Sequence, residues 1–181
     1  MTMLTSLIVA AMLCSVNGRR AGFLERHYTA VGDDDVKIDY DVIFNDVTRI
    51  QRTLADHSIC GMTDNLHDYS TGFLAQKNGY AGICYIKRLD PILDSTYENA
   101  RADIAAMTEG MSAPMPEYID MGYDRRPIGP LVLTDIAGDD IAEFCKDMPS
   151  YWLFPVPEDQ RPEATGVRAK ENCTNDTSYQ L

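Results

Sequence analysis

The sequence lacks the short motifs that mark common catalytic sites. It contains no Gly-x-Ser-x-Gly, no His-Glu-x-x-His and no phosphate-binding loop, and its 3 histidines are scattered along 181 residues. Catalysis by a nucleophile–base pair or by a metal ion needs such groups at a recognisable spacing. We therefore expect a protein that is not an enzyme and that has no catalytic residues and no cofactor.

Clusters of basic residues are also absent. Lys and Arg number 16 against 28 Asp and Glu, so the formal net charge is −12 at pH 7. A chain of this charge is repelled by nucleic acid and by anionic membrane surfaces. We therefore expect neither nucleic acid nor an anionic membrane surface as a partner.

The chain length of 181 residues suits one domain with its own hydrophobic core.

Residues 1–18 indicate a secretory signal peptide. The apolar run over 3–16 has the length of a signal-peptide core and is too short to span a bilayer. Val16 and Gly18 are small enough for the cleavage positions, and Arg19 follows directly. The lack of Lys and Arg before the run leaves a short type II membrane anchor as the alternative. We expect a mature chain that starts near Arg19 and is secreted through the endoplasmic reticulum, with membrane contact only if the signal is uncleaved.

Secretion would place the cysteines in an oxidising compartment. Four cysteines remain after removal of the signal: Cys60, Cys84, Cys145 and Cys173. An even number predicts two disulfides, for which three pairings are possible. His57, Cys60 and His67 could form part of a metal site, but a disulfide cysteine near two surface histidines explains the same pattern, and we expect no metal.

Sequons at Asn172 and Asn175 predict glycosylation of the polar tail, residues 155–181.

Alternating apolar residues predict a strand over residues 36–44, inside a linker formed by residues 19–67. Further on, Asn78-Gly79 separates two β-prone segments, 72–77 and 80–89, and favours a hairpin with a type I′ turn. Short apolar runs predict a buried strand at 131–133 and a closing strand at 151–154.

Apolar residues at steps of three and four predict helices over 91–109 and 139–147. The combination predicts an α+β fold, in which two helices cover a small, mostly antiparallel sheet of about five strands.

Several motifs resemble those of BRICHOS domains. They are Asp68, the Gly-Phe-Leu-Ala strand at 72–75, Cys84-Tyr85-Ile86-Lys87, and Phe-Cys-Lys-Asp-Met-Pro-Ser-Tyr at 144–151. Asp68 and Cys84 are separated as in that family, and a cysteine some sixty residues later, followed by Pro and Tyr, also fits. The match covers about residues 68–154, which the resemblance implies form the BRICHOS-like domain. The secretory signal and the extra cysteine pair look most like the secreted gastrokine branch.

The resemblance implies a disulfide between Cys84 and Cys145, which leaves Cys60 with Cys173. It also implies that Asp68 is a partly buried acid whose ionisation makes the fold pH-sensitive. The alternative is that Asp68 is a turn residue that caps the chain before the hairpin.

BRICHOS proteins are chaperone-like precursors, so the resemblance implies a secreted protein that binds β-prone segments and limits their aggregation, including amyloid formation, without ATP. The polar tail contains no apolar β run, so the client would be another polypeptide or the chain's own strand at 36–44. Tyr85, Tyr151 and Trp152 are candidates for contact with the client, and an oligomer is possible. A secreted interaction or growth-regulating factor is the alternative, as is a precursor of a processed peptide, for example an antimicrobial one.

Overall fold

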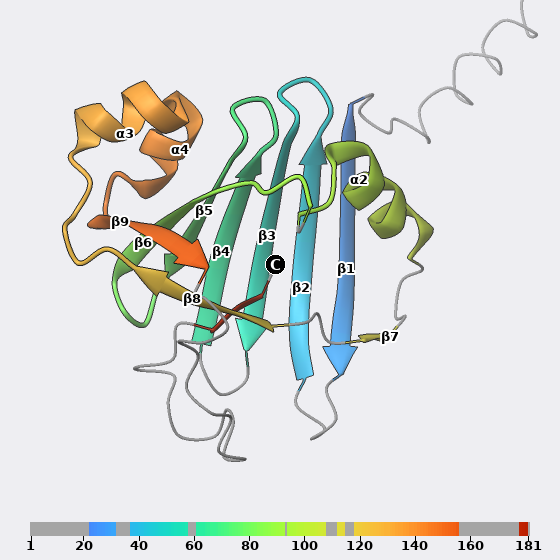
Figure 1. Cartoon of the computed structure of the whole chain (residues 1–181). Coiled ribbons are helices and arrows are strands. Elements are labelled where there is room, and N and C mark those ends of the chain that lie inside the picture. The colour runs from blue at the N-terminus through green and yellow to red at the C-terminus, as the bar shows by residue number, and fades with distance from the viewer. Residues whose placement is uncertain are drawn as a thin grey trace, which may run out of the picture.

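The computed structural model describes residues 22–31, 37–57, 61–92, 94–107, 112–114, 118–155 and 178–180. These segments form one mixed sheet of ten strands in the order β10-β8-β9-β6-β5-β4-β3-β2-β1-β7 (Figure 1). The strands are β1 (Phe23–Val31), β2 (Lys37–Asn45), β3 (Ile50–His57), β4 (Gly61–Asp68), β5 (Phe73–Asn78), β6 (Ile83–Arg88), β7 (Ser112–Pro114), β8 (Tyr118–Tyr123), β9 (Ser150–Pro155) and β10 (Ser178–Gln180). The helices are α2 (Tyr97–Ala106), α3 (Pro130–Ala137) and α4 (Asp139–Cys145).

The first six strands form an antiparallel meander, in which each strand pairs with the next one along the chain. Its register places Phe44 opposite Gln51, Gln51 opposite His67, and His67 opposite Leu74. Since directly paired residues point to the same side of a sheet, this row defines one face. The neighbouring residues Phe73 and Ala75 point to the other face.

The two faces are covered by helices at different places. Helix α2 contacts β1 and packs with Phe44 on the face of the row just described (Figure 1). Helices α3 and α4 pack on the opposite face, where Phe73, Ala75 and Ile86 contact Leu133 and Ile141. The sheet therefore has a helical cover on each face, over different strands.

The fold class expected from the sequence, a small sheet of about five strands covered by two helices, is wrong. The sheet has ten strands, and four of them lie between residues 23 and 68, where the sequence indicated only one. The alternation in β2 is clear, with inward side chains buried and outward ones exposed or half-buried. In β3 and β4 both faces carry polar residues, so these strands have no strong apolar alternation to reveal them.

Residues 131–133 are also not a strand, because they lie in helix α3. Gly129 is its N-cap residue and Pro130 occupies its first turn, where proline suits the helical backbone. A run of three apolar residues does not separate a strand from a buried helix turn, so the pattern alone was insufficient.

The central hairpin is present, but its turn is longer than expected. β5 and β6 are joined by residues 79–82, not by a two-residue type I′ turn. Gly82 has φ of 65° and donates its N–H to the Asn78 carbonyl oxygen, while the Asn78 side chain accepts from Ala81 N. Asn78 is therefore the last residue of β5 and caps the loop, whereas the expected type I′ turn placed Asn78 inside the turn itself.

A disulfide joins Cys84 of β6 to Cys145 at the end of α4, the pairing that the family resemblance implied. Both cysteines are buried, so the bond fixes the helical cover to the sheet inside the core. Other sequence predictions lie outside the described residues: the signal at 1–18, Cys60, Cys173, Asn172 and Asn175. Within the described segments, no helix has the length and hydrophobicity needed to cross a membrane.

We expect loss of the Cys84–Cys145 bond to destabilise the fold strongly. The bond closes a separation of 61 residues, and the chain-entropy model assigns a loop of this size about 4 kcal/mol. The Cys84→Ser, Cys145→Ser double variant should therefore unfold at a lower urea concentration than the unreduced wild type. An unchanged urea midpoint would mean that the crosslink does not contribute.

Candidate functional site

Helix α2 covers the apolar face of β1 and β2, but few of its side chains are buried in this contact. The helix begins after Thr96, whose hydroxyl accepts a hydrogen bond from Asn99 N at 3.3 Å, and ends at Met107. Of its ten residues only Tyr97 and Ile104 are buried. Since apolar burial is the main force that holds a helix against a sheet, this cover is weakly attached through its hydrophobic face.

Beneath α2 lies a continuous apolar row on β2, which we call the β2 ladder: Ile38, Tyr40, Val42 and Phe44. None of the four is more than 5% exposed. Their alternation with Lys37, Asp39, Asp41 and Ile43 gives the strand one apolar and one largely polar face. Displacement of α2 would expose an extended apolar surface made by one strand.

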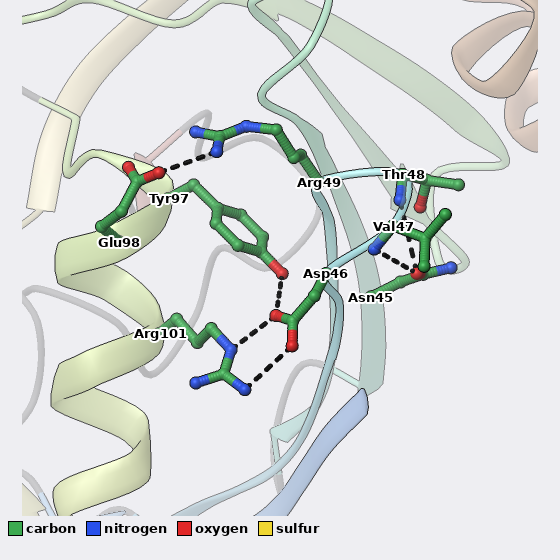
Figure 2. A network of polar contacts seen from close by, with 8 residues as sticks. All are labelled: Asn45, Asp46, Val47, Thr48, Arg49, Tyr97, Glu98 and Arg101. Atoms are coloured by element: carbon green, nitrogen blue, oxygen red, sulfur yellow. Dashed lines mark hydrogen bonds and ion pairs between the residues drawn. The ribbon is translucent and has the colours of Figure 1, made fainter. Parts of the chain in front are cut away.

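A group of polar contacts fixes α2 to the turn after β2 (Figure 2). Arg101 of the helix donates to both carboxylate oxygens of Asp46, at 2.6 and 3.0 Å, and the Tyr97 hydroxyl donates to the same carboxylate at 2.7 Å. We call Asp46, Tyr97 and Arg101 the Asp46 network. The side chains of Arg101 and Asp46 are 36% and 33% exposed, so solvent screens this ion pair in part.

The network sets the ionisation of its members. The hydrogen bonds from Arg101 and then from Tyr97 hold the pKa of the Asp46 carboxyl below its ordinary value. Burial, and then the hydrogen bond to Asp46, raises the pKa of the Tyr97 hydroxyl to about 12. At neutral pH the carboxylate is therefore charged and the phenol is neutral, which is the state in which all three contacts form.

A second ion pair lies one helical turn away from Arg101. Arg49 donates to Glu98 at 2.7 Å, and its guanidinium lies 4.9 Å from the centre of the Tyr97 ring (Figure 2). The backbone of Arg49 has φ of 56°, in the left-handed region that residues other than glycine rarely adopt. The side-chain oxygen of Asn45 caps the same turn by accepting hydrogen bonds from Val47 N and Thr48 N. The turn is thus shaped so that Asp46 and Arg49 both face α2.

A row of aromatic rings runs from α2 along the covered face of the sheet. Phe44, Tyr97 and Tyr69 meet edge to face, and Tyr69 stacks on His67 with ring centres 5.9 Å apart. Burial lowers the pKa of His67 from 6.5 to about 4; the Asp94 charge opposes this shift and the Lys87 charge adds to it. His67 is therefore neutral at physiological pH, beside the buried Lys87–Asp94 ion pair at 2.8 Å.

Beyond α2 the same face becomes polar. Its side chains Thr53, Asn65, Gln76 and Lys87 are all buried, which is unusual for a sheet interior. Asn65 Oδ1 and His67 Nδ1 are buried without a hydrogen-bond partner. The apolar region suited to an extended peptide therefore ends at β2, and does not extend across the whole sheet.

The residues expected to contact a client do not form one surface. Tyr85 and Tyr151 are paired neighbours on β6 and β9, and each meets the ring of Tyr123 edge to face. Trp152 points to the other side of the sheet, where it contacts Phe73 under α3 and α4. All three belong to the packed interior of β6 and β9, far along the sheet from the β2 ladder.

Asp68 is buried at the end of β4. Its Oδ1 accepts hydrogen bonds from Ser70 N, Ser70 Oγ and Thr71 N at 2.9, 2.6 and 3.2 Å. These are the contacts of a residue that caps a turn before a hairpin. The role of Asp68 as a pH-sensitive acid stays a prediction of the family resemblance.

Sequence reasoning missed Asp46 and Arg101 as partners. The two residues are 55 positions apart, and Arg101 lies outside the apolar stripe of its helix, so no local pattern relates them. The only local pattern near this contact is Asn45-Asp46, which is typical of a turn but does not indicate which residue the Asp46 side chain contacts. Among the described residues, no group of three side chains could hold a metal ion.

Comparison of the chain with protein-family models, with curated proteins and with solved structures gives no match. The resemblance to BRICHOS domains stays a prediction that depends on the motifs themselves.

We expect Arg101→Gln to loosen α2 without unfolding the sheet. Loss of a partly exposed bidentate ion pair costs about 1 kcal/mol, which corresponds to roughly fivefold faster hydrogen exchange of the α2 amides. Arg126→Gln is the matched control, because its ion pair with Asp124 involves an arginine that is 89% exposed. Equal exchange of α2 in both variants would show that the Asp46 network does not hold the helix.

The same network should respond to acid. Because the pKa of Asp46 is lowered in the folded state, its contribution to stability is present above its unfolded pKa and is lost as pH falls through its folded pKa. The protection factors of the α2 amides, that is, their exchange rates corrected for the pH dependence of exchange in an unfolded chain, should therefore fall below about pH 4 in the wild type, and the Asp46→Asn variant should not show this fall.

His67 should make the whole fold less stable at a milder acidity. Its folded pKa of about 4 lies below its ordinary 6.5, so the unfolded chain takes up a proton first. Stability should fall as pH is lowered from 6.5 towards 4, by up to about 1.4 kcal/mol per pH unit. In His67→Gln this slope should decrease, as measured by urea unfolding. The slopes above pH 7.5 serve as the internal control, and an identical slope at every pH would contradict the assignment.

Proposed function

We propose that the mature protein binds extended, apolar, β-prone segments of other polypeptides and slows their aggregation, without ATP and without covalent chemistry. The observation that carries this proposal is the β2 ladder beneath a helix that buries only two of its ten residues. An apolar strand face with a weakly attached cover is a suitable place for an extended segment to bind after local opening.

The edge of the sheet next to this ladder gives the client a backbone partner. Among the described strands, only β7 pairs with the outer edge of β1, and it does so at Thr29, Ala30 and Val31. The preceding residues of β1, from Phe23 to Tyr28, have no described strand on that side. A client strand could add there through main-chain hydrogen bonds that do not depend on its sequence.

The position of α2 joins these two features. Leu24 and Tyr28 of β1 pack in the same cluster as the β2 ladder and as Tyr97 and Ile104 of α2. Apolar side chains of a strand added beside β1 would therefore meet the surface that α2 covers. Opening of α2 would then control access, and the Asp46 network would set how often the helix opens.

The family resemblance supports the same proposal independently, because BRICHOS domains are chaperone-like. We also propose secretion, on the basis of the predicted signal peptide. The client is a separate polypeptide in this proposal, since β2 itself is already paired on both sides within the sheet.

The test places a charge under α2 and measures client binding. Ile104→Asp puts a carboxylate into the buried contact, at a cost of about 2–4 kcal/mol, and should favour the open state. We expect lower stability, stronger binding of an apolar dye, and a longer lag time for fibril formation by an unrelated amyloid peptide at a substoichiometric ratio of protein to peptide.

Ala105→Asp is the matched control, because it adds the same charge at an exposed position of the same helix turn. It should leave the lag time close to that of the wild type. A folded Ile104→Asp protein that loses all client binding would place the site elsewhere. If neither the wild type nor this variant changes the lag time of any amyloid peptide, the protein is not a chaperone, and the alternative of a secreted interaction factor is favoured.

A further inference from the structure

Helix α3 exposes an apolar surface on the side that faces away from the core. Leu133 and Ala137 are buried against the sheet, whereas Leu131, Val132 and Ile136 are 83%, 50% and 48% exposed. Figure 1 shows α3 at the end of the molecule away from α2. The helix is thus apolar on both sides, which is unusual for a helix at a protein surface.

A single carboxylate lies within this exposed surface. At about 100° per residue, the helix places Asp135 between Leu131 on one side and Val132 and Ile136 on the other. Asp135 is exposed and has no hydrogen bond or ion pair with any described residue. We call Leu131, Val132, Asp135 and Ile136 the α3 surface.

Two further carboxylates flank the end of α3. Asp139 and Asp140 form the first turn of α4, directly after Gly138, and both are exposed without an ion pair among the described residues. The α3 surface is therefore apolar with a negative centre, and the chain that follows it is also acidic. Exposed apolar groups gathered on one element mark interaction sites more often than isolated ones do.

A second copy of the chain does not fit this surface. A two-fold axis through the middle of the α3 surface would bring the Asp135 carboxylates of both copies together, and like charges at such a contact are destabilising. The helix has eight residues, so it is about 12 Å long and offers less area than a stable dimer needs. The charge instead favours a partner with a basic group at the centre of its own apolar surface.

We propose that the α3 surface is a docking site for an amphipathic helix of a partner protein, with Lys or Arg inside the apolar face of that helix. The apolar residues on the partner pack against Leu131, Val132 and Ile136 through the ridges that helices present to each other. The basic residue pairs with Asp135. Because the contact is small, binding is weak and reversible.

This site is separate from the one under α2. Helices α3 and α4 pack on the opposite face of the sheet, so the docked helix does not contact the β2 ladder. The proposal therefore does not depend on chaperone activity and can fail or succeed without it.

The experiment measures binding of a synthetic amphipathic peptide of leucine and lysine to the mature protein by fluorescence anisotropy. A peptide of the same pattern with glutamate in place of lysine is the charge control. Leu131→Ser together with Ile136→Ser should weaken binding of the lysine peptide at least tenfold while leaving the fold intact, since both side chains are exposed. Asp135→Asn should weaken it and reduce its dependence on salt.

Ile92→Ser is the matched protein control, because Ile92 is also exposed but lies outside α3. It should bind the lysine peptide as tightly as the wild type. Equal binding by the α3 double variant and the wild type would overturn the proposal, because the peptide would then bind through net charge alone. Tight binding of the glutamate peptide, or a wild-type dimer that the double variant loses, would overturn it as well.

Discussion

The rest of the structure depends on the register of the six-stranded meander. Because side chains alternate along every strand, the register decides for each residue of β1–β6 which face it occupies. A slip of one residue between β2 and β3 would leave the β2 ladder on one face and carry the polar positions of the next strands to the other. The positions of the β2 ladder, of the buried polar side chains on the same face and of the two helical covers therefore all depend on this register.

The two covers are attached in different ways. Helices α3 and α4 are fixed by a buried disulfide and by fully buried aliphatic side chains such as Ile141. Helix α2 has two buried residues and relies on ion pairs that water partly screens. One face of the sheet is thus permanently closed at β4–β6, while the cover at β1–β2 is the part of the fold that opens at least cost.

The sequence predicted the elements whose local pattern agrees with their place in the fold. The alternation of β2 and the apolar face of α4 coincide with buried side chains, and the aromatic run of β9 contains the buried Leu153 between half-buried Trp152 and exposed Phe154. β1, β3 and β4 were missed because the meander pairs them through backbone hydrogen bonds and polar side chains, which leave little apolar periodicity. Helix α3 was mistaken for a strand because three apolar residues carry no period.

The candidate site was predictable only in part. The β2 ladder and the buried positions Tyr97 and Ile104 of α2 follow from periodicity. Asp46 and Arg101 could not be paired, because a contact across 55 residues depends on the meander that brings the turn beside the helix. The placement of Trp152 on the face opposite Tyr85 likewise depends on a parallel pairing with β6 that no local pattern specifies.

The disulfide has a consequence for α2 as well as for the helices that it fixes. Residues 97–106 lie between Cys84 and Cys145, so α2 belongs to a covalently closed loop. When the helix leaves the sheet, both of its ends stay attached, and its effective concentration at the β2 ladder remains high. The chain thus carries a built-in competitor for its own ladder, which would limit how long an extended segment stayed bound and would return the sheet to its covered state.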